Sequence, residues 1–265
     1  MNIAIVTGAS SGMGREFARK LTKYVQVDEI WAIARRETAL ESLKGELMTP
    51  VRPIALDLLD SASFKKLQTL LEAENPNVSL LVNAAGFGKM GSSDHVSLED
   101  DCRMIDLNVK ALVRMTRICL PYMRAGSHIL ELASLSSFQP VPYLNTYAAT
   151  KAFVQSYSRG LNQELKDRGI RVMALNPGWV KTEFFDHAMK TNTGEVTHFD
   201  PLMEPEYIVS TALHDLDETK KDSCVPNFRV KAQVLAVKLL PHTLVMKIWL
   251  AQQKKPKNNT GLTTK

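Results

Sequence analysis

The chain has 265 residues, 45% of them hydrophobic and 23% charged, which excludes a disordered, collagenous or low-complexity protein. Its formal charge of +5 is unevenly distributed, because eight basic residues and no acidic ones follow Asp222. The rest of the chain keeps 25 of the 33 basic residues against 28 acidic ones, so a mildly acidic body precedes a basic tail.

The sequence does not indicate a disulfide-bonded, secreted, membrane-spanning or metal-binding protein. Cys102, Cys119 and Cys224 form no CxxC pair, which favours a reducing compartment over a disulfide framework. The first residues lack the basic region of a signal peptide, and no stretch reaches the ~18 uncharged apolar residues of a membrane span. We therefore expect a cytoplasmic protein. The six histidines show no ligand spacing, so no metal site is expected.

Short apolar runs alternate with helical patterns from the first residue. The runs that predict strands are 3–7, 29–34, 51–56, 80–83, 128–133 and 171–175. The helical patterns cover 15–24, 37–48, 61–74 (after a cap at Asp60 or Ser61), 100–122 and 146–168. Parallel strands need a helix to return the chain. The alternation therefore predicts a single-domain α/β Rossmann fold, a doubly wound parallel sheet of about seven strands with helices on both faces.

The alternation stops after Pro177. Residues 182–205 show no clear period, and we expect a substrate lid over about 183–205. A helix over 206–216 and a last strand near 223–226 complete a predicted domain of residues 1–228. Residues 229–265 form a basic, apolar tail that is helical in period to about residue 253 and broken at Pro241.

A glycine-rich loop follows the first strand and opens the first helix. It reads Thr7-Gly8-Ala9-Ser10-Ser11-Gly12-Met13-Gly14. Its three glycines allow a tight turn and the close approach of a pyrophosphate, to which the helix N-terminus offers free N–H groups and a positive dipole end. A purely structural turn is the alternative, but the position between strand and helix favours dinucleotide binding.

Arg35 and Arg36 follow the second strand, where such folds place a carboxylate for the ribose 2′-hydroxyl. Guanidinium groups suit a 2′-phosphate, which favours NADP(H), although a solvated pair at the start of the next helix is the alternative. Asp57, which precedes Leu58 after the third strand, either accepts from the adenine amino group or caps the following turn. The sequence does not separate these two roles.

Tyr147 and Lys151 lie four residues apart in a predicted helix and so share one face. Ser134 follows the fifth strand, at the carboxyl edge where doubly wound sheets bind ligands. Hydride transfer to a carbonyl needs a proton donor, and a nearby lysine and a positive nicotinamide would lower the pKa of a tyrosine from ~10 toward the working range. A serine hydroxyl would share the charge that develops on oxygen. The Tyr147–Lys151 spacing alone is weak evidence for a catalytic site, since the same spacing is common on exposed helix faces.

With these motifs together, the chain resembles the short-chain dehydrogenase/reductase family over roughly residues 1–225. The matching motifs occur in family order: Thr7-Gly8-x-x-x-Gly12-x-Gly14, Asn83-Ala84-Ala85-Gly86, Leu107-Asn108-Val109, Ser134, Tyr147-x-x-x-Lys151 and Pro177-Gly178-x-Val180-x-Thr182. Two departures are small. The family's second Asn is Ala84, and its Ser-Ser pair reads Ala133-Ser134, so that Ser136 becomes the alternative if the register slips.

The resemblance implies further roles. Asn83, Ala84, Ala85 and Gly86 would back the adenosine half of the cofactor, and Asn108 would hold a water that links Lys151 to solvent. Pro177, Gly178, Val180 and Thr182 would hold the nicotinamide carboxamide and its phosphate. Lys151 would also bind the nicotinamide ribose, and Arg35 resembles the position found in NADP-preferring members. A homodimer or homotetramer is expected.

These observations predict an NADP(H)-dependent oxidoreductase that acts on a carbonyl or alcohol substrate. Four phenylalanines follow segments expected at the substrate site and could make its entrance apolar, although burial in the core is an equal alternative: Phe87, Phe138, Phe184 and Phe185. One rival is a non-catalytic NADP(H)-binding regulator that recruits a partner or membrane through its tail. Another is an epimerase or dehydratase, but those chains carry a sizeable C-terminal substrate domain that is missing here.

The tail leaves three interpretations open. It could lie on an anionic membrane surface, pack on a sister subunit, or cover the active-site cleft. Nucleic-acid binding is not expected, because its basic residues are interleaved with Val and Leu and few aromatic residues are there to stack bases.

Overall fold

The computed structural model describes residues 1–254 of the chain. Seven parallel strands form one sheet in the order β3-β2-β1-β4-β5-β6-β9, which confirms the predicted fold class. The strands are β1 (Asn2–Thr7), β2 (Glu29–Ala34), β3 (Val51–Ala55), β4 (Asn77–Asn83), β5 (His128–Leu132), β6 (Arg171–Leu175) and β9 (Ser223–Cys224). The order reverses between β1 and β4, and such a switch point opens a crevice for ligands at the carboxyl ends of the strands.

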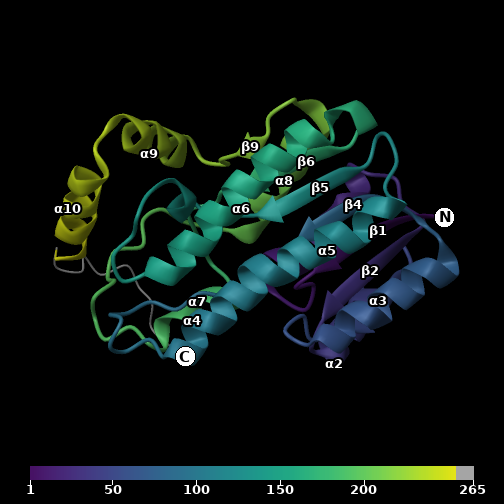
Figure 1. The fold of residues 1–265 in the computed structure, drawn as a ribbon, viewed down its shortest axis with the longest axis horizontal. Helices are drawn as coiled ribbons and strands as arrows, with labels where there is room; N and C mark the ends of the chain where they lie inside the picture. The colour runs from purple at the N-terminus through teal and green to yellow at the C-terminus, as the bar shows by residue number, and fades with distance from the viewer. Residues whose placement is uncertain (255–265) are drawn as a thin grey trace.

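Helices cover both faces of the sheet. Figure 1 shows α3, α5 and α6 across one face, while α1, α2 and α8 pack on the other. The helices are α1 (Gly12–Lys20), α2 (Glu37–Lys44), α3 (Ser61–Glu74), α4 (Leu98–Ile105), α5 (Leu112–Cys119), α6 (Asn145–Glu164), α7 (Glu183–Met189), α8 (Pro205–Glu218), α9 (Phe228–Leu239) and α10 (His242–Gln253).

The surroundings of β1 explain why its sequence is apolar without a break. Ala4 and Val6 face the same core as Phe17 of α1, and Ile3 and Ile5 face the core on the other side of the sheet. Because both faces are covered, a strand of a parallel sheet needs no polar side. Each large apolar side chain that is fully buried here contributes about 1.5–3 kcal/mol.

The long helical pattern predicted over 100–122 is a continuous helix whose type changes along its length, from α to π and back to α. Helix α4 begins after Ser97, whose side chain accepts from the Asp100 N–H at 3.1 Å. A π-helical segment, Asp106–Ala111, joins α4 to α5, and a 3-10 turn, Leu120–Tyr122, ends the continuous helix. Such segments occur often at functional sites, and this one contains Asn108.

The expectation that residues 183–205 lack regular structure was wrong at two places. They contain α7, and Leu202–Met203 forms a strand, β8, that pairs in parallel with β7 (Trp179–Val180). Both elements are too short to show a period in the sequence.

Helices α9 and α10 meet at Pro241, where the sequence predicted a break. Figure 1 shows this pair at one end of the molecule, far from β2. Val230 of α9 joins the core beneath α8, and Trp249 of α10 joins a smaller cluster with Val141 and Leu144. Within residues 1–254, no helix has the length and apolar character needed to cross a membrane.

Candidate active site

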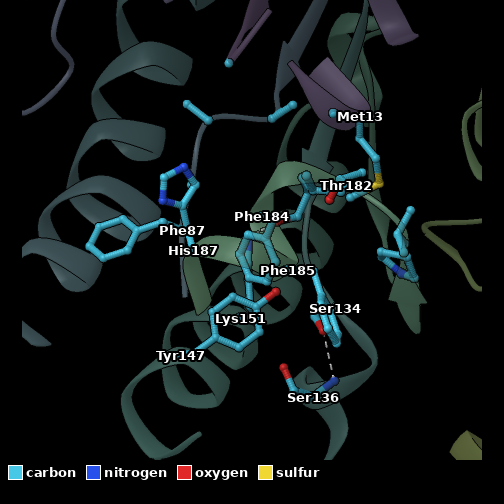
Figure 2. Close-up of a pocket in the computed structure, with 18 of the residues that line it drawn as sticks. Met13, Phe87, Ser134, Ser136, Tyr147, Lys151, Thr182, Phe184, Phe185 and His187 are labelled. Carbon is cyan, nitrogen blue, oxygen red and sulfur yellow. Dashed lines mark hydrogen bonds between the residues drawn. The ribbon is translucent and has the colours of Figure 1, made fainter. Parts of the chain in front are cut away.

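A cavity of about 740 Å³ lies at the carboxyl edge of the sheet. Of the residues predicted to bind the cofactor or act in catalysis, all but Asn83 and Asn108 line it: Gly8, Ser10, Ser11, Gly12, Met13, Gly14, Arg35, Arg36, Asp57, Leu58, Ala84, Ala85, Gly86, Ser134, Tyr147, Lys151, Pro177, Gly178, Val180 and Thr182. Figure 2 shows Met13 and Thr182 on one side of this cavity and Tyr147 and Ser134 on another.

The glycine-rich loop is shaped for close approach. Gly8 and Gly12 have φ angles of +69° and +52°, which side chains rarely adopt, and a Cβ at Gly14 would overlap the Gly8 carbonyl oxygen. Helix α1 begins at Gly12, and its first turn carries no acidic side chain to occupy the free N–H groups. The loop thus brings its backbone to the wall of the cavity.

The two arginines after β2 differ in their contacts. Arg36 donates to Glu183 Oε2 of α7 at 3.0 Å and lies 3.4 Å from Ser10, so it joins the loop to α7. Arg35 is exposed at the cavity. The Asp57 carboxylate accepts from the Leu59 N–H at 3.0 Å, the local turn that the sequence allowed, while the residue also lines the cavity.

Asn83 turns away from the cavity. Its Nδ2 donates to Thr116 of α5 at 3.0 Å, whereas the backbone of the next two residues is held by Thr7. Thr7 Oγ1 accepts from the N–H groups of Ala84 and Ala85, both at 3.0 Å. The motif therefore contributes backbone to the cavity, and its asparagine anchors the strand end to a helix.

Asn108 is buried behind the cavity and makes a paired contact with one backbone unit. Its Oδ1 accepts from the Phe87 N–H at 3.0 Å and its Nδ2 donates to the Phe87 carbonyl at 2.9 Å. A Cβ at Gly86 would lie 2.9 Å from this Oδ1 and 3.6 Å from Lys151 Nζ. A side chain at position 86 would therefore displace the Asn108 side chain from its place beside Lys151.

Ser134, Tyr147 and Lys151 converge from two elements. Ser134 lies two residues after β5 and precedes a 3-10 turn (Leu135–Phe138), which it caps: its Oγ accepts from the Ser136 N–H at 3.2 Å (Figure 2). Ser137 Oγ donates to the Lys151 carbonyl at 2.9 Å and so ties this turn to α6. Lys151 Nζ lies 5.7 Å from the centre of the Tyr147 ring and donates to the Leu132 carbonyl at 2.6 Å.

Burial sets the proton affinities of this group. It raises the pKa of Tyr147 to about 12, against the opposing effect of a hydrogen bond with Ser134. It lowers the pKa of Lys151 to about 8, although the nearby Glu131 carboxylate acts in the opposite direction. Before any cofactor binds, Tyr147 is therefore a neutral phenol at neutral pH.

Glu131, on β5, is a buried carboxyl that sequence reasoning missed. Burial raises its pKa to about 7, with opposing contributions from Thr116, Asn83 and Lys151. Thr116 Oγ1 lies 2.9 Å from both Glu131 Oε1 and the Leu112 carbonyl, and one hydroxyl proton can serve only one of them. A protonated Glu131 removes this conflict, because it donates to Thr116 while Thr116 donates to Leu112.

The other part of the cavity is apolar and aromatic. Phe87, Phe184 and Phe185 line it, one of the two alternatives left open by the sequence, but Phe138 does not: it lies beside Lys238, whose Nζ is 5.4 Å from the ring centre. Lining residues from β7, α7, the segment between α7 and β8, α9 and α10 were not predicted: Trp179, His187, His198, Gln233, Trp249 and Gln252. Trp249 Nε1 donates to the Pro142 carbonyl at 3.1 Å, which brings the tail to the wall of the cavity.

The glycine-rich loop and Tyr147 meet at the switch point of a doubly wound sheet, which defines the class of dinucleotide-dependent oxidoreductases. The profile of the short chain dehydrogenase family matches residues 2–193, and the chain belongs to this family.

Similar proteins with known names include NADP-dependent enzymes. An NADP-dependent 3-hydroxy acid dehydrogenase of Escherichia coli is 36% identical over 197 residues, 73% of this chain and 79% of that protein. The enzyme of the same name from Salmonella typhi is 33% identical over 245 residues, 91% of this chain and 95% of that protein. An uncharacterized oxidoreductase of Staphylococcus epidermidis is 31% identical over 182 residues, 68% of this chain and 78% of that protein.

Solved structures of other proteins have the same overall fold. A short-chain dehydrogenase from Sphingobium yanoikuyae in complex with NADPH has a TM-score of 0.77 at 26% identity, with coverage of 97% of this chain and 99% of that one. A serine dehydrogenase complexed with NADP⁺ has a TM-score of 0.70 at 31% identity, with coverage of 84% and 93%.

Proposed function

We propose that this protein is an NADP(H)-dependent oxidoreductase that transfers a hydride between the nicotinamide and a carbonyl or alcohol substrate. The observation that carries the proposal is the convergence of Ser134, Tyr147 and Lys151 on the cavity that the glycine-rich loop also lines. The family supports the reaction class, and the names of several relatives support the cofactor.

The cavity fits a dinucleotide phosphate. The backbone at Gly8, Gly12 and Gly14 leaves space that a Cβ would fill, and the N-terminus of α1 supplies donors for a pyrophosphate. Arg35 is the residue we assign to the 2′-phosphate, because Arg36 is already paired with Glu183. Backbone and side chains of Pro177, Gly178, Val180 and Thr182 would hold the nicotinamide end.

The cofactor would supply the hydride, and the chain would supply the proton. In the reduction direction, the Tyr147 hydroxyl donates its proton to the substrate oxygen as the carbonyl carbon becomes a carbinol carbon. Ser134 Oγ donates a hydrogen bond to the same oxygen and shares its developing charge. Its contact with the Ser136 N–H uses only a lone pair, so the Ser134 proton that stabilises the Tyr147 oxygen in the free enzyme can be donated to the substrate oxygen instead, which supports Ser134 over Ser136.

Lys151 would act on the cofactor and on Tyr147. One of its three N–H groups is used by the Leu132 carbonyl, which leaves two for the ribose hydroxyls and a water. Its positive charge near the Tyr147 ring favours the phenolate that forms when the proton leaves. Asn108 holds the Phe87 backbone and Gly86 beside Lys151, and we assign to it the relay role that the family resemblance implies.

The substrate that the site favours is a largely apolar carbonyl compound. Aromatic rings dominate the lid side, where Trp179, Phe185 and Phe199 pack edge to face. Two cations that line the cavity are paired with carboxylates: Lys89 with Asp100 at 3.4 Å and Arg103 with Glu99 at 3.6 Å. A 3-oxo acid, as the names of the relatives suggest, would share these cations with Asp100 or Glu99.

An NADPH-oxidation panel tests the proposal. It should contain 3-oxo acids, aldehydes, aryl ketones, steroids and acyl thioesters, each measured with NADPH and with NADH. We expect turnover of apolar carbonyl compounds with a preference for NADPH. Tight NADPH binding without turnover of any substrate class would overturn the assignment as an enzyme.

A further inference from the structure

Helix α9 is apolar on two opposite faces. Val230, Val234 and Val237 are buried against the body of the protein. On the opposite side, Phe228, Leu235 and Leu239 are 81%, 61% and 76% exposed and lie on one stripe at spacings of seven and four residues. An exposed stripe of large apolar side chains is unfavourable in water unless something covers it.

Helix α10 continues this pattern. Val245 and Trp249 face inward, whereas Leu244 and Ile248 are each 43% exposed on the outer side, one turn apart. Leu240, in the link between the helices, is also exposed. We call this exposed set of residues on α9, the link and α10 the outer face: Phe228, Leu235, Leu239, Leu240, Leu244 and Ile248.

Within α9 and α10, the charged residues beside the outer face are all basic. Lys231 lies one turn from Phe228 and Leu235, Lys247 lies one turn from Leu244, and Arg229 lies on the other flank of α9. From Ser223 to the end of the sequence there is no Asp or Glu. Apolar side chains between lysines on a surface helix are typical of segments that lie in the plane of an anionic membrane.

We propose that the outer face of α9 and α10 docks on an anionic lipid bilayer. The apolar side chains enter the boundary between headgroups and acyl chains, and the lysines and arginine contact lipid phosphates. A second copy of this chain fits less well, because a two-fold contact through this face would bring two sets of basic side chains together without an acidic partner within it. A bilayer offers the apolar region and the negative charge together.

The same helices reach the cavity. Val230, Gln233, Trp249 and Gln252 line it from their inner sides, opposite to the outer face. Docking of α9 and α10 would therefore hold the substrate part of the cavity next to the lipid surface. This inference concerns docking alone and stands whether or not the proposed reaction is correct.

Vesicle flotation of the full chain tests the proposal. One set of vesicles contains phosphatidylcholine alone, and the other contains phosphatidylcholine with a third of phosphatidylglycerol. Two double variants change the outer face: Lys231→Glu/Lys247→Glu reverses charge, and Leu235→Ser/Leu239→Ser removes apolar surface. Matched controls lie elsewhere: Lys65→Glu/Lys66→Glu on α3, and Leu98→Ser, whose side chain is 80% exposed at the start of α4.

We expect binding to the anionic vesicles and little to the neutral ones. Reversal of the two lysines should weaken it by about 30-fold or more, since each is worth ~1 kcal/mol near such a surface. Loss of the two leucines should weaken it by about tenfold or more. The control variants should bind as the wild type does, and thermal melting and NADPH binding should stay unchanged in all of them.

Three results would overturn the proposal. The first is equal binding to neutral and anionic vesicles, and the second is binding that the outer-face variants leave intact. The third is absence of vesicle binding together with a dimer that Leu235→Ser/Leu239→Ser dissociates in sedimentation velocity, which would assign the outer face to a second copy of the chain.

Discussion

The buried carboxyl of Glu131 allows a stability prediction with a defined sign. Its pKa is about 7 in the folded protein, against the ordinary value of 4.5 for a glutamate in the unfolded chain, so the folded state binds more protons between these pH values. Stability from this group is present below pH 4.5 and is lost as the pH rises through 7. At 1.36 kcal/mol per pKa unit, the deprotonated group costs the folded state about 3 kcal/mol at pH 8.

The variant Glu131→Gln removes this cost and keeps the shape, because its amide can donate to Thr116 as the protonated acid does. Urea unfolding should show the variant more stable than the wild type by about 3 kcal/mol at pH 8 and nearly equal at pH 4.5. Glu72→Gln, at an exposed position of α3, should show no such pH-dependent difference. A Glu131→Gln variant that is less stable than the wild type at pH 8 would refute the reasoning.

Three further predictions concern the cavity. Arg35→Ala should raise the Kd for NADPH by at least about tenfold, the value of a charge-assisted hydrogen bond, and leave that for NADH nearly unchanged; equal loss for both would remove the 2′-phosphate assignment. Gly86→Ala should lower kcat in NADPH-coupled assays, because its Cβ would lie 2.9 Å from Asn108 Oδ1, and an unchanged kcat would contradict that packing. Trp249→Leu should raise KM for apolar carbonyls and lower the free energy of unfolding by about 1–3 kcal/mol, whereas an unaltered KM would place the substrate elsewhere.

The sequence was most informative where local rules and tertiary structure agree. Strands such as Ile3–Thr7 are continuous apolar runs because both faces of a parallel sheet are covered, and the spacing of Gly8, Gly12 and Gly14 follows from φ angles and close backbone contacts. The four-residue spacing of Tyr147 and Lys151 places both on one side of α6. These features depend on neighbours along the chain, which a sequence displays directly.

What the sequence did not display depends on contacts between distant segments. Glu131 looks like a surface residue until α5 and α6 bury it, and Trp249 reaches the cavity only because α10 packs against Pro142. Asn83 belongs to a recognisable motif, yet its side chain turns to Thr116 and not to the cavity. Helix α7 spans only seven residues, too few for a period to emerge.

The most direct test of the account is turnover by Tyr147→Phe, which removes only the hydroxyl that donates the proton. With a substrate of the wild type, kcat should fall by about a hundred- to ten-thousand-fold while NADPH binding, followed by cofactor fluorescence, stays unchanged. Tyr157→Phe on the same helix is the matched control, because its hydroxyl has no hydrogen-bond partner among residues 1–254, and it should turn over normally. A Tyr147→Phe enzyme with near-wild-type kcat would contradict the assignment of Tyr147 as the acid–base group.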